Sequence, residues 1–259
     1  MWQDIFTARQ SEGNLSYHYM EDDYHHIRDM YRYYMDRNVL KENPLDKPLV
    51  LRHTKKDHRR PFTDAERTAF LQAAKRYDYE WFFLFAMYFM TGCRRGELLA
   101  LQWQDVDFEE HCIHIRHGIA YGVVDGIRQE IFSQPKTKAS IRSIPISDKA
   151  YFVLRVWYLK KKPAGDAFVF QTKTPSLHPW ISLTEVAYAF RYVRKMAGID
   201  ERLTLHCIRH TVASKLVTAG IDLATIQRIG GWSSPNTLLR IYAHSNDVAV
   251  KAAMRKAIF

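Results

Sequence analysis

The sequence has 259 residues, 47% of them hydrophobic, which is enough for one large or two modest hydrophobic cores. Lysine and arginine number 38 against 28 aspartate and glutamate, and the formal net charge of +10 favours a polyanionic partner, nucleic acid before membrane. The longest apolar run, residues 81–90, is too short to cross a bilayer, and no glycine-rich nucleotide motif occurs, so a membrane span and a nucleotide cofactor are both disfavoured.

The first sixty residues are expected to form a helical segment followed by a linker. Apolar side chains recur at helical intervals within residues 16–42, which predicts one long helix or a short pair that stops at Asn43-Pro44. Residues 51–60 are strongly basic and read as an exposed linker. Two interpretations of its charges stay open: they are solvated, or Arg59 and Arg60 contact DNA phosphates.

The rest of the chain, residues 61–259, is expected to form one mainly helical domain. The capping box TDAE at Thr63 predicts the first helix, and a change to a period of two predicts a three-stranded meander in CIHIRHGIAYG, RQEIFSQPKT and SIRSIPI. Helices are expected over residues 79–90, 94–104, 148–161, 183–197, 205–219 and 222–230, with a short one after Ser234 and a last one from Asp247. The predicted fold is mainly α with a small antiparallel β-sheet (α+β).

One stretch, LHCIRHT at residues 205–211, concentrates polar chemistry on one helix face. His206, Arg209 and His210 fall together at offsets of three and four. Zinc binding is one reading of the histidine spacing, although the position of the general-base Glu is a cysteine and the arginine would repel a cation. A solvent-facing polar surface is the second reading, and an anion site is the third. The stretch alone leaves the three open.

The cysteine pattern indicates the redox environment. Cys93, Cys112 and Cys207 are odd in number, scattered and never in CxxC spacing. We expect reduced thiols and a cytoplasmic protein.

Four stretches occur in a characteristic order. They are TGCRRGELLAL at 91–101, PKTKASIRSIPI at 135–146, LHCIRHT at 205–211 and IGGWSSPNTLLRIYAH at 229–244. Together they resemble the catalytic domain of the phage integrase family, the tyrosine recombinases, in its TGxRxxEL box, hairpin lysine, HxxRH box and final box with the nucleophile. The resemblance covers roughly residues 61–250. It implies a metal-independent, site-specific recombinase (integrase) of a phage or mobile element, without any cofactor.

The resemblance assigns the nucleophile and the charge-stabilising residues. Tyr242 would attack a DNA phosphodiester and leave a 3′-phosphotyrosyl link and a free 5′-hydroxyl. Arg94 and Arg209 would donate hydrogen bonds to the non-bridging oxygens, where negative charge builds up in the transition state. These arginines would take the place of a metal ion.

The resemblance also distributes the proton transfers. Lys136 is the predicted general acid for the departing 5′-oxygen, with Lys138 in the same turn as its alternative and otherwise a DNA contact. His206 would accept the tyrosine proton or hold a phosphate oxygen. Trp232 occupies the His/Trp position, where its indole N–H can donate to phosphate but cannot transfer a proton.

Neighbouring residues are given supporting roles. Glu97, one turn after Arg94, is expected to orient Arg94 through an ion pair. His210 is expected to support the residues of the site without contacting the substrate itself. Arg95 is expected to contact phosphate or the surface. In the last box, Gly230-Gly231 replaces the more frequent Leu-Gly, which predicts a looser loop.

The front of the sequence departs from the family pattern. The stretch MYRYYMDRNVLKENPLDKP resembles the last helix of a core-binding domain, so residues 1–50 are interpreted as a partial DNA-binding segment. A truncated chain, a decayed gene and a minimal enzyme are all compatible with so short a segment.

The resemblance implies double-stranded DNA as the partner and a homotetramer assembled on it, with the tail 247–259 packing on a neighbouring subunit. A monomer in solution is the alternative state, and a directionality factor is a further candidate partner. Two rival functions remain open: a type IB topoisomerase that only cleaves and rejoins, and a DNA-binding remnant without turnover.

Overall fold

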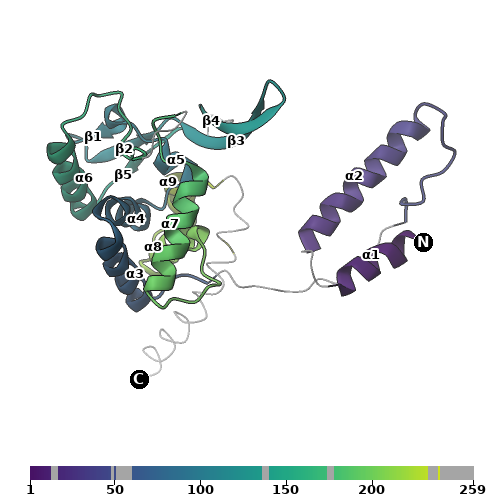
Figure 1. The fold of residues 1–259 in the computed structure, drawn as a ribbon, viewed down its shortest axis with the longest axis horizontal. Coiled ribbons are helices and arrows are strands. Elements are labelled where there is room, and N and C mark those ends of the chain that lie inside the picture. The colour runs from purple at the N-terminus through teal and green to yellow at the C-terminus, as the bar shows by residue number, and fades with distance from the viewer. Residues whose placement is uncertain are drawn as a thin grey trace. The chain divides into compact units, whose positions relative to one another are not determined.

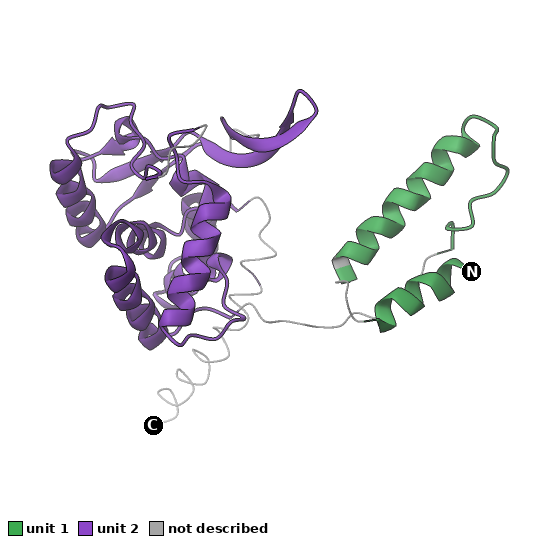
Figure 2. Ribbon diagram, viewed as in Figure 1, with its two compact units in different colours: residues 1–57 green, residues 58–259 purple. Residues whose placement is uncertain are grey.

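The computed structural model describes residues 1–12, 17–47, 50, 60–135, 140–173, 178–232 and 239. The chain divides into two compact units, residues 1–57 and 58–259 (Figure 2). Within the described ranges, none of the helices combines the length and the apolar character needed to cross a membrane.

The first unit is a pair of helices, α1 (Trp2–Ser11) and α2 (Tyr17–Met35). The prediction of a helix within residues 16–42 is confirmed in α2, whereas α1 was not predicted. The only buried residue that α1 contributes is Phe6, so its apolar periodicity is weak in the sequence. The unit also buries Met20 and Leu45.

The second unit is mainly helical, as expected, with small antiparallel sheets (Figure 1). The helices among its described residues are α3 (Asp64–Tyr77), α4 (Tyr79–Thr91), α5 (Arg95–Leu99), α6 (Asp148–Lys161), α7 (Leu183–Met196), α8 (Leu205–Thr218) and α9 (Leu223–Gly230). Capping boxes form at the starts of α3 and α7, where Thr63 and Ser182 exchange hydrogen bonds with Glu66 and Glu185.

The core of the second unit forms where α3, α4 and α7 meet. The ring of Phe70 from α3 lies 5.1 Å from the rings of both Phe85 and Phe190, measured between centroids. Most residues of α4 are buried, which confirms the prediction of a buried helix for its apolar sequence. The core holds α4 beside α8. It thereby positions the first box, which begins at the end of α4, next to the third box, which lies at the start of α8.

The prediction of a single three-stranded meander is wrong. The structure has a three-stranded antiparallel sheet with the order β1 (Val106–Asp107), β2 (Cys112–Ile115), β5 (Arg142–Pro145), and a separate hairpin of β3 (Gly118–Val124) and β4 (Ile127–Ser133). Figure 1 shows this hairpin projecting beyond the helices. A period of two gives the faces of a strand but does not show that the chain changes sheet between β2 and β3.

The helix predicted over residues 94–104 is also shorter than expected. It ends at Leu99 in α5, and a 3₁₀ turn follows at Trp103–Asp105. Gly96 of α5 packs on β3 so closely that a Cβ atom there would lie 2.1 Å from the carbonyl oxygen of Ile119. This contact places the first box beside the hairpin.

Candidate active site

Arg209 lies at the centre of the site and is almost completely buried. Its side chain emerges from α8 and is 2% exposed, and its Nη1 donates to the carbonyl oxygen of Gly92 at 3.0 Å. Burial lowers the pKa of Arg209 to about 10, with the carboxylate of Glu97 acting in the opposite direction. The guanidinium is still charged at neutral pH. The reading of LHCIRHT as a solvent-facing surface is therefore wrong for its arginine.

Glu97 joins the first box to the strand β5. Arg94 donates to it twice, from Nη1 to Oε1 at 2.7 Å and from its backbone N–H to Oε2 at 2.8 Å. Arg142 donates from Nη2 to Oε2 at 2.8 Å and from Nη1 to Oε1 at 3.1 Å. Burial acts to raise the pKa of Glu97, but the hydrogen bonds from Arg142 and Arg94 hold it below its ordinary value. The expected ion pair with Arg94 is present, and the carboxylate is shared by two arginines.

Arg142 is the residue of this network that the sequence analysis missed. Its side chain is 5% exposed, and its Nε donates to the carbonyl oxygen of Ile229 at 2.7 Å. Arg94 Nη2 donates to the carbonyl oxygen of Gly231. Two cations thus bind carbonyl groups at the carboxyl end of α9, where the helix dipole favours positive charge. Arg142 stands inside the hairpin-lysine box, which was its only signal in the sequence.

The two glycines of the last box lie in close contact with other side chains of the site. A Cβ atom on Gly230 would lie 1.7 Å from Cζ3 of Trp232. Gly231 caps α9 with φ +67°, and a Cβ atom there would lie 2.8 Å from Nη1 of Arg142. The Trp232 ring is consequently held with its centroid 3.9 Å from Cζ of Arg209. The rest of this loop, residues 233–238, lies outside the described residues, so the expectation of a looser loop stays a prediction.

The two histidines of the third box lie at different depths. His206 is exposed and His210 is half-buried one turn later, with their ring centroids 4.8 Å apart and their planes at 76°. Only His206 lines the cleft described next. This placement agrees with a direct role for His206 and a supporting position for His210.

These residues open into a cleft of about 900 Å³ bordered by α5, α7, α8 and the β3–β4 hairpin. Five arginines line it: Arg94, Arg95, Arg191, Arg194 and Arg209. His206 and Trp232 also line it. No residue that lines it in the described part of the chain is acidic. A cleft with this charge is suited to a polyanion.

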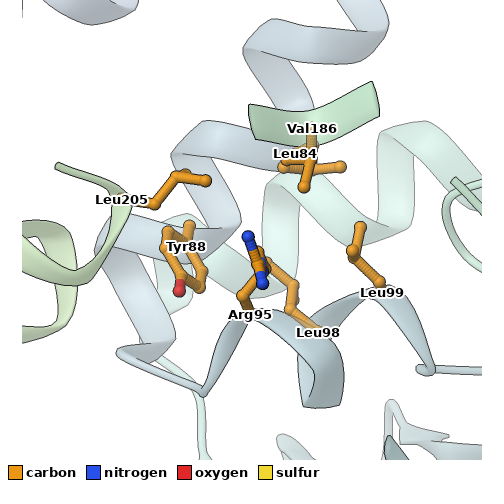
Figure 3. Close-up of a pocket in the computed structure, with 7 residues that line it drawn as sticks. All are labelled: Leu84, Tyr88, Arg95, Leu98, Leu99, Val186 and Leu205. Atoms are coloured by element: carbon orange, nitrogen blue, oxygen red, sulfur yellow. The ribbon is translucent and has the colours of Figure 1, made fainter. Parts of the chain in front are cut away.

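Arg95 approaches the cleft over an apolar floor. Figure 3 shows its side chain among those of Leu84, Tyr88 and Leu205, which come from α4 and α8. Tyr88 is 3% exposed, and burial raises the pKa of its phenol. Tyr88 is therefore a poor nucleophile although it lines the cleft.

Four predicted residues, Arg59, Lys136, Lys138 and Tyr242, lie outside the described residues. Arg60 is described and forms a bidentate pair with Glu66 at 2.6 and 2.8 Å. The hydrogen bond from Arg60 lowers the pKa of Glu66 to about 2 against the effect of burial. In this structure Arg60 stabilises the start of α3.

Residues 60–248 match the model of the phage integrase family. The chain belongs to the phage integrase family. Among its relatives in that family is a tyrosine recombinase XerC-like protein of Caldanaerobacter subterraneus subsp. tengcongensis, 29% identical over 237 residues that cover 84% of this chain and 60% of the relative. The ICEBs1 integrase of Bacillus subtilis is 30% identical over 218 residues, which cover 80% of this chain and 56% of the relative.

Solved structures show the same fold. The Tn1549 transposon integrase in complex with circular intermediate DNA superposes with a TM-score of 0.79 at 24% identity, covering 98% of this phage integrase family member and 84% of that chain. A lambda integrase dimer bound to a core site superposes with a TM-score of 0.63 at 18% identity, covering 90% of this chain and 78% of that chain. This chain thus has the family's fold while spanning 60% or less of the two curated relatives above.

Proposed function

We propose that the protein is a site-specific DNA recombinase that cuts and rejoins strands through a 3′-phosphotyrosyl intermediate on Tyr242, and that it integrates and excises a mobile element. The observation that carries this proposal is the cleft in which Arg94, Arg209, His206 and Trp232, residues of three separate family boxes, meet, and in which no described lining residue is acidic.

The geometry supports one task for both arginines, which are held in place by different partners. Arg209 is held rigidly by the Gly92 carbonyl and the Trp232 ring, and Arg94 by Glu97 and the Gly231 carbonyl. Donors held in fixed positions stabilise the charge of a pentavalent phosphate without having to reorganise during the reaction. Metal ions are not required for this chemistry, because the arginines supply the positive charge.

The two proton transfers are proposed for His206 and Lys136. His206 is exposed in the cleft and can take the proton of the attacking phenol. Lys136 is proposed as the general acid for the 5′-oxygen. Arg95, Arg191 and Arg194 are proposed to contact DNA phosphates along the cleft.

The proposed partners follow from the reaction. Double-stranded DNA is the substrate, and exchange between two duplexes requires four active sites, hence a homotetramer on DNA. Residues 1–50 would serve as a partial core-binding segment. A directionality factor is a further proposed partner, and the cytoplasm is the proposed place of action because the DNA substrate lies there.

The test is a covalent-capture assay in EDTA. Nicked suicide duplexes built from the DNA that flanks the gene are incubated with the protein, and adducts are resolved on a denaturing gel. We expect an adduct that is lost in Tyr242→Phe and kept in Tyr121→Phe, a matched control because Tyr121 also lines the cleft. Retained DNA binding without any adduct would contradict the proposed activity.

A second assay separates recombination from simple cleavage and rejoining. Supercoiled plasmids carrying paired sites are incubated with the protein, and their products are sequenced. Exchanged strands are expected for a recombinase, whereas relaxed circles alone would indicate a topoisomerase.

A further inference from the structure

Three side chains that the proposed reaction does not use converge on one face of the three-stranded sheet. Asp107 of β1 pairs with Cys112 of β2, and His114 lies two residues further along β2 on the same face. One carboxylate oxygen, the thiol sulfur and one imidazole nitrogen all lie within 4.8 Å of one another. The strand register therefore gathers three different metal-ligating atoms.

The distances suit an ion placed between these atoms. His114 Nε2 lies 3.8 Å from Cys112 Sγ and 3.8 Å from Asp107 Oδ2. The second distance exceeds the roughly 2.7–3.2 Å of an N–H···O hydrogen bond. With metal–ligand bonds of about 2.0–2.3 Å in a tetrahedral zinc site, the ligand atoms stand roughly 3.3–3.6 Å apart. The three atoms thus lie slightly farther apart than in an occupied zinc site, while the other carboxylate oxygen of Asp107, Oδ1, accepts from the backbone N–H groups of Glu109 and Glu110.

The histidine is already oriented for this role. Its other ring nitrogen, Nδ1, lies 2.8 Å from the hydroxyl of Ser143, the residue that pairs with His114 on β5. A hydrogen bond at Nδ1 fixes the ring so that Nε2 faces the thiol and the carboxylate, which is how metal-binding histidines are commonly held. The side chains of His114 and Asp107 are 26% and 32% exposed, so an ion can reach them from solvent.

We propose that Asp107, Cys112 and His114 bind one zinc ion, with a fourth position open to water or another small ligand. None of the three lines the arginine-rich cleft. The ion would link β1 to β2. Through the contact of His114 with Ser143 it would also stabilise β5, in which Arg142 directly precedes Ser143. The proposed site does not depend on the proposed recombinase activity.

Cobalt and zinc titrations of the metal-free full chain test this proposal. We expect one equivalent of Co²⁺ to give tetrahedral d–d absorption and a thiolate-to-cobalt charge-transfer band, both abolished when Zn²⁺ displaces it. Cys112→Ser should remove the charge-transfer band. Ser143→Ala should weaken zinc binding about 10–100-fold, because it removes only the residue that orients His114.

Matched variants distinguish this cluster from other ligands in the chain. Glu109→Gln removes a carboxylate from the same turn, and Cys207→Ser removes a thiol elsewhere; both should keep the band and the stoichiometry. Circular dichroism would establish that Asp107→Asn and His114→Gln, at partly exposed positions, stay folded while they lose binding. The proposal would be overturned if the folded chain bound no stoichiometric metal, or if the band survived in Cys112→Ser.

Discussion

Arg94 and Arg142 bind the same buried carboxylate, with Arg94 Nη1 2.7 Å from Glu97 Oε1 and Arg142 Nη2 2.8 Å from Glu97 Oε2. Both guanidinium groups also donate to carbonyl oxygens at the end of α9. One carboxylate therefore connects the first box, the strand β5 and the loop that presents Trp232. The geometry of the cleft depends on this connection.

Glu97→Gln should destabilise the protein strongly, because it leaves Arg142 buried without its counter-charge. We expect the free energy of unfolding to fall by about 3–5 kcal/mol in urea denaturation at neutral pH. Glu66→Gln, which weakens a surface pair and a helix cap, should cost only about 1 kcal/mol. Equal losses in the two variants would show that the shared carboxylate has no special role.

Gly230→Ala should disturb the site through the Trp232 ring. The added Cβ atom would lie 1.7 Å from that ring, so the ring must leave its place over Arg209. We expect a stability loss of about 1–3 kcal/mol and a slower formation of the covalent adduct. Gly165→Ala, where a Cβ atom meets nothing within 4 Å, should change stability by less than about 0.5 kcal/mol. Normal adduct formation in Gly230→Ala would show that cleavage does not depend on the position of the Trp232 ring.

Arg191→Ala should reduce the salt dependence of DNA binding, because Arg191 lines the cleft. The slope of log Kd against log salt concentration should decrease by about 0.9 if one phosphate contact is lost. Fluorescence anisotropy with a labelled duplex at several salt concentrations measures this slope. Arg155→Ala removes the same charge from α6, away from the cleft, and should leave the slope unchanged. Identical slopes for both variants would indicate a non-specific charge effect.

Lys136→Ala should slow cleavage by about 10²–10⁴-fold, because the 5′-oxygen then leaves without a proton donor. A substrate with sulfur in place of the bridging 5′-oxygen should restore the rate, since a thiolate leaves without protonation. Lys138→Ala is the matched control and should cleave either substrate at nearly the normal rate. Rescue of Lys138→Ala alone would move the general-acid role to that residue.

The pair of Glu66 and Arg60 should make stability depend on acid pH. The hydrogen bond from Arg60 lowers the pKa of Glu66 in the folded protein to about 2, below its ordinary value of 4.5. The unfolded chain thus binds more protons between these values, so stability rises with pH in this window and is lost as pH falls through it. The stability difference between the parent and Glu66→Gln should shrink between about pH 5 and pH 3. A difference that stays constant over this range would contradict the shift.

Several elements could be predicted because their causes are local. The capping boxes at Thr63 and Ser182 act within one helical turn, and the apolar run of α4 can only be buried. The end of α5 at Leu99 could not be predicted, because residues 100–105 look helical in sequence, whereas the backbone N–H groups of Trp103 and Gln104 donate to the distant carbonyl oxygens of Ala167 and Gly165.

By itself the sequence determined the mainly helical fold, the family and the order of its boxes, and it placed His206 and Arg209 on one helix with the correct offsets. These features depend on residue spacing within one element or on motifs read along the chain. The tertiary structure alone decided that Arg142 completes the Glu97 network, that the two glycines make room for Trp232 and Arg142, and that Asp107, Cys112 and His114 meet. Each of these depends on strand pairing or helix docking between distant segments, and a linear pattern carries no information about which distant side chains will share one volume.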